Sequence, residues 1–199
     1  MSRPLSLLIE LAGVALVLTL GALLVRGAAQ PTPQSSGVPT TSVTDDLQPC
    51  VLDQSGYIHG RLYGAIKINV DWTGSALACG GMARPNKRGV RLVFASPAQS
   101  QSKRRIFVIG IDRTIDKLAR GEAAINLTII DEKSGRFFGT RGLDRCWTQV
   151  SDVKKIASAP GTYRVDGDLY CAGSIPSLSD NASVTLSDFH YSGRLTLDE

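Results

Sequence analysis

From Tyr57 onward, apolar and polar residues alternate in short runs that are separated by glycine and aspartate clusters. In residues 66–72, isoleucine, valine and tryptophan occupy one phase, while lysine, asparagine and aspartate occupy the other. A period of two residues is the pattern of a half-buried β-strand. Similar runs recur at residues 90–94, 125–129, 163–171 and 184–197, so the sequence predicts an all-β fold.

Residues 106–111 differ from these runs, because they are apolar in both phases and therefore predict a central strand that is covered on both faces. A turn at 131–135 predicts a hairpin with a returning strand at 136–140, and a phase slip at 187–188 predicts a bulge or a bend. Short helices are expected at 112–120 and 151–156. About eight or nine strands favour an antiparallel β-sandwich, with a β-barrel as the alternative. The expected core contains Trp72, Phe94, Ile109, Leu127, Val165 and Leu186.

The N-terminal residues 1–27 contain the longest apolar run of the chain. Residues 11–25 carry no charge, and residues 5–25 would form a hydrophobic helix roughly 31 Å long. That length suits a membrane anchor. Small residues at 27–29 also fit the cleavage site of a signal peptide, so the sequence leaves both interpretations open.

Residues 28–46 are rich in proline, serine, threonine and glutamine and have almost no large apolar side chains. Such a segment buries too little surface to order itself, so it is expected to be a flexible linker. Residues 47–199 remain, which is enough for one domain with its own core. The expected location is the cell envelope: a single-pass membrane protein with a periplasmic or extracellular domain, or a secreted or periplasmic protein after cleavage.

All four cysteines lie beyond the apolar segment, at Cys50, Cys79, Cys146 and Cys171. An even number of cysteines in an exported domain predicts two disulfides. Zinc sites usually contain closely spaced cysteine pairs, whereas the nearest spacing here is 25 residues. Of the three pairings, Cys50–Cys79 and Cys146–Cys171 are favoured, because each closes a short loop.

The charge of the chain is unevenly distributed. Residues 84–120 contain ten basic residues against two acidic ones, whereas the balance is acidic from Asp144 onward. A basic face on an exported domain would attract an anionic polymer, a lipid headgroup or an acidic protein partner. Nucleic acid is not expected as a partner in this compartment. The candidate binding residues are those in the two loop-like parts of the basic region: Arg84, Lys87, Arg88, Lys103, Arg104 and Arg105.

No catalytic motif is recognisable. The chain lacks a nucleophile elbow, a His-Glu-x-x-His sequence and a phosphate-binding loop. The two histidines, His59 and His190, and the carboxylates of Asp166 and Asp168 are expected on solvated strand faces. The sequence therefore predicts no catalytic residue, no metal site and no cofactor.

Three functions remain open. The first is a non-enzymatic binding or accessory module in the envelope, which recognises an anionic component or a partner protein. The second is an envelope-directed hydrolase that uses surface carboxylates. The third is a structural subunit of an envelope assembly. A polar pocket that gathers two or more of Asp144, Asp166, Asp168, Asp188 and His190 would favour the hydrolase, whereas a basic face would favour the binding module.

Overall fold

A computed structural model describes residues 47–85, 88–96 and 104–197. These residues belong to one compact unit, residues 41–199. The expected helix at 5–25 and the linker at 28–46 lie outside the described residues. Within the described part, no helix is long and apolar enough to span a membrane.

The fold is a single antiparallel sheet of 12 strands that is curled into a half-barrel. The first half of the sheet contains β4 (Ala78–Ala83), β5 (Val90–Ala95), β6 (Arg105–Ile111) and β7 (Glu122–Asp131), with the short strands β1 (Gln48–Pro49) and β8 (Arg136–Gly139) beside them. The second half contains β9 (Cys146–Lys155), β10 (Thr162–Cys171), β12 (Ser183–Thr196), β2 (Tyr57–Gly64) and β3 (Ile68–Thr73), with β11 (Ile175–Pro176) paired to β12. The prediction of an all-β antiparallel fold is confirmed.

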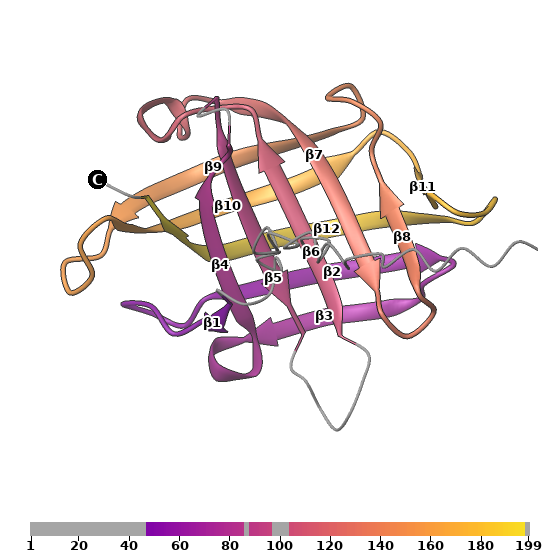
Figure 1. Cartoon of the computed structure of the whole chain (residues 1–199), viewed down its shortest axis with the longest axis horizontal. Coiled ribbons are helices and arrows are strands. Elements are labelled where there is room, and N and C mark those ends of the chain that lie inside the picture. The colour runs from indigo at the N-terminus through magenta and orange to yellow at the C-terminus, as the bar shows by residue number, and fades with distance from the viewer. Residues whose placement is uncertain (1–46, 86–87, 97–103, 198–199) are drawn as a thin grey trace, which may run out of the picture. The chain divides into compact units, whose positions relative to one another are not determined.

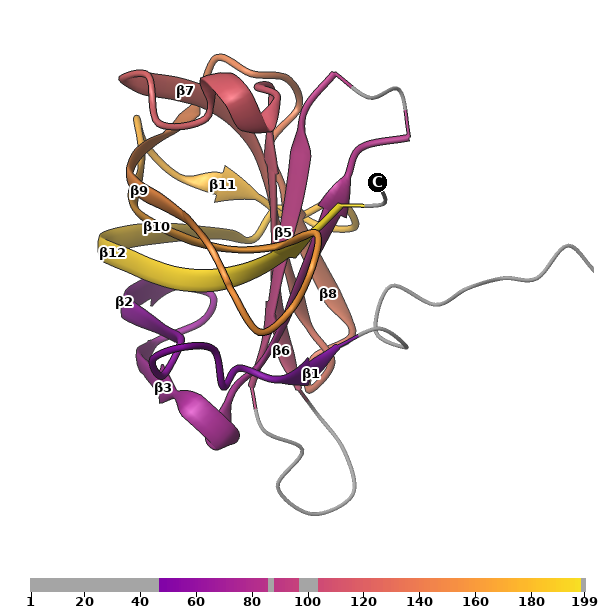
Figure 2. The same cartoon turned by 90° about the vertical axis from the view of Figure 1, so that its left-hand side faces the viewer.

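The two halves face each other, and their strands cross steeply rather than running side by side (Figure 1 and Figure 2). The sheet stays continuous because residues 122–125 of β7 pair with β9, while residues 128–131 pair with β8. Hydrogen bonds therefore connect the halves, which in a β-sandwich would be two separate sheets. Nine of the described strands have six or more residues, which agrees with the expected number of eight or nine, and β8 is the returning strand expected after the turn at 131–135. The two-residue strands β1 and β11 are too short to be recognised by period.

Aromatic side chains from both halves meet in the core. Phe94 of β5 lies 5.8 Å from Tyr191 of β12, and Phe107 of β6 lies 5.5 Å from Phe189 of β12, measured between ring centroids. Tilted aromatic pairs at such separations are favourable beyond the area that they bury. The hydroxyl of Tyr191 is hydrogen-bonded to Thr148 at 2.7 Å, so the buried polar group is satisfied.

Most of the predicted strand features are confirmed. Five of the six expected core residues are buried, whereas Trp72 is only half-buried and packs on Phe107. The phase slip coincides with a register shift in β12, where Asp188 has a φ of 55°. Both disulfide pairings, Cys50–Cys79 and Cys146–Cys171, are confirmed. Two disulfides suggest an oxidising, extracytoplasmic compartment.

The two expected helices are the exceptions. Residues 151–156 were expected to be helical, but β9 continues to Lys155, because Val153, Lys154 and Lys155 pair with β10. Tertiary pairing therefore overrides the local helical preference. Between residues 112 and 120, the only helical element is one 3-10 turn, η2 (Ile115–Lys117), and a second such turn is η1 (Gly74–Ala76).

Glycines allow the backbones of β4 and β12 to approach closely where the halves cross. We call this crossing of Ala78–Ala83 by Ser183–Thr196 the seam. A Cβ on Gly81 would lie 2.6 Å from the carbonyl oxygen of Arg194 and 2.8 Å from that of Arg91. Both neighbours are backbone atoms and cannot rotate away, so the seam depends on the absence of a side chain at this position.

Replacing Gly81 by alanine tests this close approach. We expect Gly81→Ala to lower the free energy of unfolding by about 1–3 kcal/mol, as overpacking does. Gly110→Ala is the matched control, because its Cβ would meet atoms at 3.6 Å or more, and its effect should stay within about 1 kcal/mol in either direction. Urea unfolding monitored by circular dichroism measures both variants. Equal stabilities would contradict the proposed role of Gly81.

Candidate functional site

A groove of about 1180 Å³ runs along the seam and is the candidate binding site. Its lining comes from five places: the segment before β2, the β4–β5 hairpin, the β6–β7 connection, the β9–β10 connection and the end of β12. Much of the lining is apolar, including Leu47, Val51, Leu52, Met82, Val93, Ile115, Ile156 and Leu197. Val93 also belongs to a small apolar cluster with Ala95 and Ile106, which is separate from the main core.

The free edge of β4 forms one side of the groove. β1 pairs with Ala78 and Cys79 only, so among the described residues no strand pairs with the rest of β4 on that side. In the β4–β5 hairpin, the N–H of Arg84 donates a hydrogen bond to the carbonyl of Gly89, which fixes the residues of β4 that are hydrogen-bonded to β5. The alternation of the antiparallel ladder directs the N–H and C=O groups of Gly81 and Ala83 away from β5. The groove therefore contains backbone donors and acceptors as well as apolar side chains.

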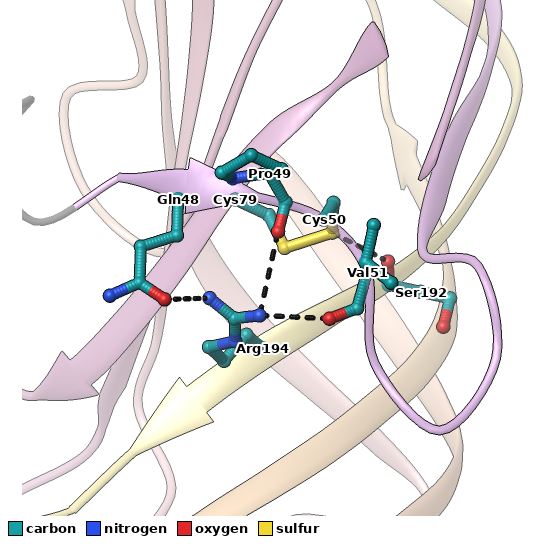
Figure 3. The surroundings of a disulfide bond; sticks show 7 residues. All are labelled: Gln48, Pro49, Cys50, Val51, Cys79, Ser192 and Arg194. Carbon is teal, nitrogen blue, oxygen red and sulfur yellow. Dashed lines mark hydrogen bonds between the residues drawn. A yellow bond between two sulfur atoms is a disulfide. The ribbon is translucent and has the colours of Figure 1, made fainter. Parts of the chain in front are cut away.

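A strap of four residues, Gln48–Val51, borders the groove. Figure 3 shows the contacts that hold it. Cys50 is joined to Cys79 of β4, with the two Cα atoms 5.0 Å apart. From β12, the guanidinium of Arg194 donates to Gln48 Oε1 at 2.9 Å and to the carbonyl oxygens of Pro49 and Val51 at 3.4 and 3.0 Å. The strap thus connects β4 covalently, and β12 by hydrogen bonds, across the seam.

An ion-pair cluster holds the loop that follows the strap. Arg164 of β10 contacts Asp53 at 3.1 Å, Asp166 at 2.9 Å and Asp152 at 3.5 Å. Burial alone would raise the pKa of Asp53, but Arg164 and Lys154 outweigh this effect and lower the pKa below its ordinary value of 3.8. By alternation, Arg164 lies on the same strand face as Asp166, which was expected to be solvated, yet the side chain of Arg164 is only 10% exposed because the loop covers it.

Two arginines, Arg91 and Arg194, are the only charged residues that line the groove in the described part of the chain. Arg91 has no carboxylate partner there: its Nη2 lies 3.0 Å from the Met82 sulfur, and its Nε is buried without an acceptor. A thioether is a weak acceptor, and an unsatisfied buried donor is costly. Among the described residues, the positive charge of Arg91 therefore has no anionic partner.

The predicted basic residues do not gather in this groove. Since β5 separates the two loops, Arg84 and Arg88 lie at one end of the strand, and Arg104 and Arg105 lie at the other. The expected convergence of the two loops at one end of the fold is therefore not found. Lys87 and Lys103 lie outside the described residues.

Three of the predicted arginines also have acidic neighbours. Arg84 pairs with Asp112 at 3.5 Å, Arg104 with Glu132 at 4.0 Å and Arg105 with Asp131 at 3.1 Å. The ion pairs with Glu132 and Asp131 connect β6 to the end of β7, so they have a structural role in the sheet. These acidic neighbours partly neutralise the positive charges of the three arginines, whereas Arg91 has no such neighbour among the described residues.

The carboxylates and histidines considered for catalysis lie outside the groove lining. Asp166 belongs to the Arg164 cluster, and Asp168 contacts His190 on the exposed face of the second half. Asp188 accepts a hydrogen bond from the Ser187 hydroxyl at 2.7 Å and makes a long contact of 3.9 Å with Arg61. Within residues 47–85, 88–96 and 104–197, no three His, Cys, Asp or Glu side chains are grouped as metal ligands.

Sequence reasoning did not select Arg91 and Arg194 as binding residues. Arg91 was counted in the basic region, but its position inside a strand gave no reason to separate it from its neighbours. The detectable signal was the pair Gly80-Gly81 together with Gly193, since glycines within strands mark places where another backbone approaches closely. That signal could have located the seam, but it could not have located the groove beside it.

These features define a class: an antiparallel β half-barrel with two disulfides and a groove along its open seam. Comparisons with known proteins find no matching family model, and no curated protein or solved structure with significant similarity. The functional argument therefore rests on the geometry of this chain.

The ion-pair cluster gives a prediction about the strap and its loop. Replacing Arg164 by methionine should lower the free energy of unfolding by more than about 1 kcal/mol, because three carboxylates lose their shared cation. Arg136→Met breaks the more exposed Arg136–Asp180 pair and should cost no more than about 1 kcal/mol. Denaturant unfolding at pH 7 compares the two variants.

The same cluster predicts a pH dependence. A carboxylate with a lowered pKa stabilises the fold above its ordinary pKa, and this stabilisation is lost as the pH falls through the lowered value. The stability difference between wild type and Arg164→Met should therefore shrink below pH 3.8, where Asp53 takes up its proton. A difference that stays constant down to pH 2 would exclude the ionic contribution.

Proposed function

We propose that the protein is an extracytoplasmic binding module that holds an anionic amphiphile in the seam groove. The observation that carries the proposal is Arg91, a guanidinium that has no carboxylate partner among the described residues and lies in a groove whose described lining contains no acidic residue. An anionic headgroup bound there would supply the missing acceptor. Charge-assisted hydrogen bonds of this kind are about twice as strong as neutral ones.

The apolar lining supports a ligand with a hydrocarbon part rather than a purely polar anion. Ligand sites are commonly 300–1,000 Å³ in volume and mainly apolar, with few polar groups. The groove is slightly larger, at about 1180 Å³, and it adjoins the apolar cluster of Val93, Ala95 and Ile106. An anionic lipid combines both required properties.

The N-terminal part of the chain is consistent with such a ligand. We propose that residues 1–27 are a membrane anchor or a signal peptide and that residues 28–46 are a linker. As a flexible chain, a linker of this length spans roughly 25 Å on average. Leu47 and Gln48, which follow it directly, line the groove. If the anchor is retained, the groove would remain within reach of the membrane surface.

The two other functions have less support. A hydrolase would need the carboxylates in a cleft, but Asp166, Asp168 and Asp188 lie outside the groove lining, and Asp166 is engaged by Arg164. A structural subunit would use a free strand edge for assembly. The free edge of β4 borders the groove, and the other edge strand, β3, carries the polar residues Asn69 and Asp71, which disfavour edge-to-edge pairing.

Removing the charge of Arg91 tests the proposal. The full chain in an uncharged detergent is titrated with dioctanoyl phosphatidylglycerol in a calorimeter, and dioctanoyl phosphatidylcholine serves as the comparison lipid. We expect Arg91→Gln to weaken binding of the anionic lipid about tenfold or more, which corresponds to one charged hydrogen bond of roughly 1.5–3 kcal/mol.

Arg61→Gln is the matched control, since it removes the same charge from an exposed residue outside the groove. Its affinity should match that of the wild type. Equal losses in both variants would mean that attraction depends only on net charge and would reject the groove as the site. Equal affinity of the wild type for the two lipids would reject the anionic selectivity.

A further inference from the structure

The two histidines of the chain lie opposite each other on adjacent strands, far apart in sequence. His190 of β12 is paired in register with His59 of β2. Each is flanked by an aspartate on the next strand outward: Asp168 of β10 pairs with His190, and Asp71 of β3 pairs with His59. The four strands β10, β12, β2 and β3 thus carry a cross-strand row in the order Asp, His, His, Asp.

Each imidazole is held by its own aspartate. His59 Nδ1 lies 2.7 Å from Asp71 Oδ1, and His190 Nδ1 contacts Asp168 Oδ1. An ionised carboxylate only accepts hydrogen bonds, so Nδ1 of each ring must carry the proton. In a neutral imidazole, Nε2 is then the unprotonated nitrogen with a lone pair. The aspartates therefore select the tautomer that can bind a metal through Nε2.

The same contacts also orient the two rings. The Nδ1 atom of His190 is turned outward to β10, and that of His59 is turned outward to β3. Because Nε2 lies on the opposite side of an imidazole from Nδ1, the Nε2 edges of the two rings are turned inward, toward each other above the β12–β2 pair. Directly opposite residues in an antiparallel pair have Cβ atoms about 4.5–5.5 Å apart.

Neighbouring features restrict this arrangement further. The ring of Tyr57 stacks on His59 with centroids 4.7 Å apart and an interplanar angle of 22°. The bulge in β12 between Ser187 and His190 lies immediately before the second histidine, and bulges re-aim the side chains beside them. The histidine side chains are 38% and 54% exposed, so an ion could reach them from solvent.

We propose that His59 and His190 form a site for a divalent transition-metal ion, with Zn²⁺ or Cu²⁺ bound between the two Nε2 atoms. Imidazole nitrogens bind such ions at about 2.0–2.1 Å, and a carboxylate on the second ring nitrogen is the usual supporting contact. Water would complete the coordination, because only two protein ligands are present and the aspartates act through the histidines. This inference replaces the expectation of two solvated histidines without a metal, and it is independent of the groove.

Calorimetric titration of the full chain with Zn²⁺ tests the site, using protein that carries no polyhistidine tag. We expect one saturable site in the wild type. His59→Ala and His190→Ala should each weaken binding more than about tenfold, since loss of a supporting contact alone costs 10–100-fold. Asp71→Asn should lower the affinity less than either histidine variant. In NMR spectra of the wild type, ring signals of both histidines should shift together during the titration.

Asp188→Asn is the control, because it removes an exposed carboxylate near this row that contacts neither imidazole, and its affinity should be unchanged. Mg²⁺, which prefers oxygen ligands, should not bind. The proposal is overturned if the wild type shows no saturable Zn²⁺ binding, or if both histidine variants bind as the wild type does. All the substituted side chains are exposed, so circular dichroism should show unchanged folding.

Discussion

The close approach of β4 to β12 is the constraint on which the rest of this structure depends. Gly81 allows the backbone of Arg194 to come near, and Gly193 gives the ring of Phe94 the space that a side chain would occupy. These contacts bring the two halves of one sheet together over a common aromatic core. In the part of the chain that the structure describes, β4 has no strand partner on that side beyond Cys79, and its free edge borders the groove.

The strap converts this crossing into a defined site. A disulfide that closes a loop of 29 residues restricts the unfolded chain and is worth about 3–4 kcal/mol. Arg194 and Arg164 add polar contacts from two neighbouring strands, so the segment from Gln48 to Asp53 is fixed at both ends. The consequence is a groove that is bordered by the tethered strap and lined by apolar side chains and by Arg91, which has no carboxylate partner among the described residues. Such preorganisation reduces the entropy cost of ligand binding.

Much of the fold could be predicted because strand alternation is a local property. The burial of residues 106–111, the slip in β12 and both disulfides followed from period, phase and spacing. The groove could not be predicted, because it arises where residues of β4 and β12 meet, and period does not reveal which strands cross. The separation of the two basic loops could not be predicted for a related reason. Consecutive hairpin loops lie at opposite ends of an antiparallel meander, so β5 separates charges that are close in sequence. The facing histidines likewise depend on a register that no local pattern encodes.

Hydrogen–deuterium exchange of the full chain, with and without dioctanoyl phosphatidylglycerol, tests the account most directly. The outward-facing amides of Gly81 and Ala83 and the end of β12 at residues 194–197 all border the groove. We predict that the anionic lipid slows exchange in these two segments together and leaves the phosphatidylcholine control unchanged. Protection that is confined to Arg104 and Arg105 at the far end of β5, with none in β4, would contradict the account.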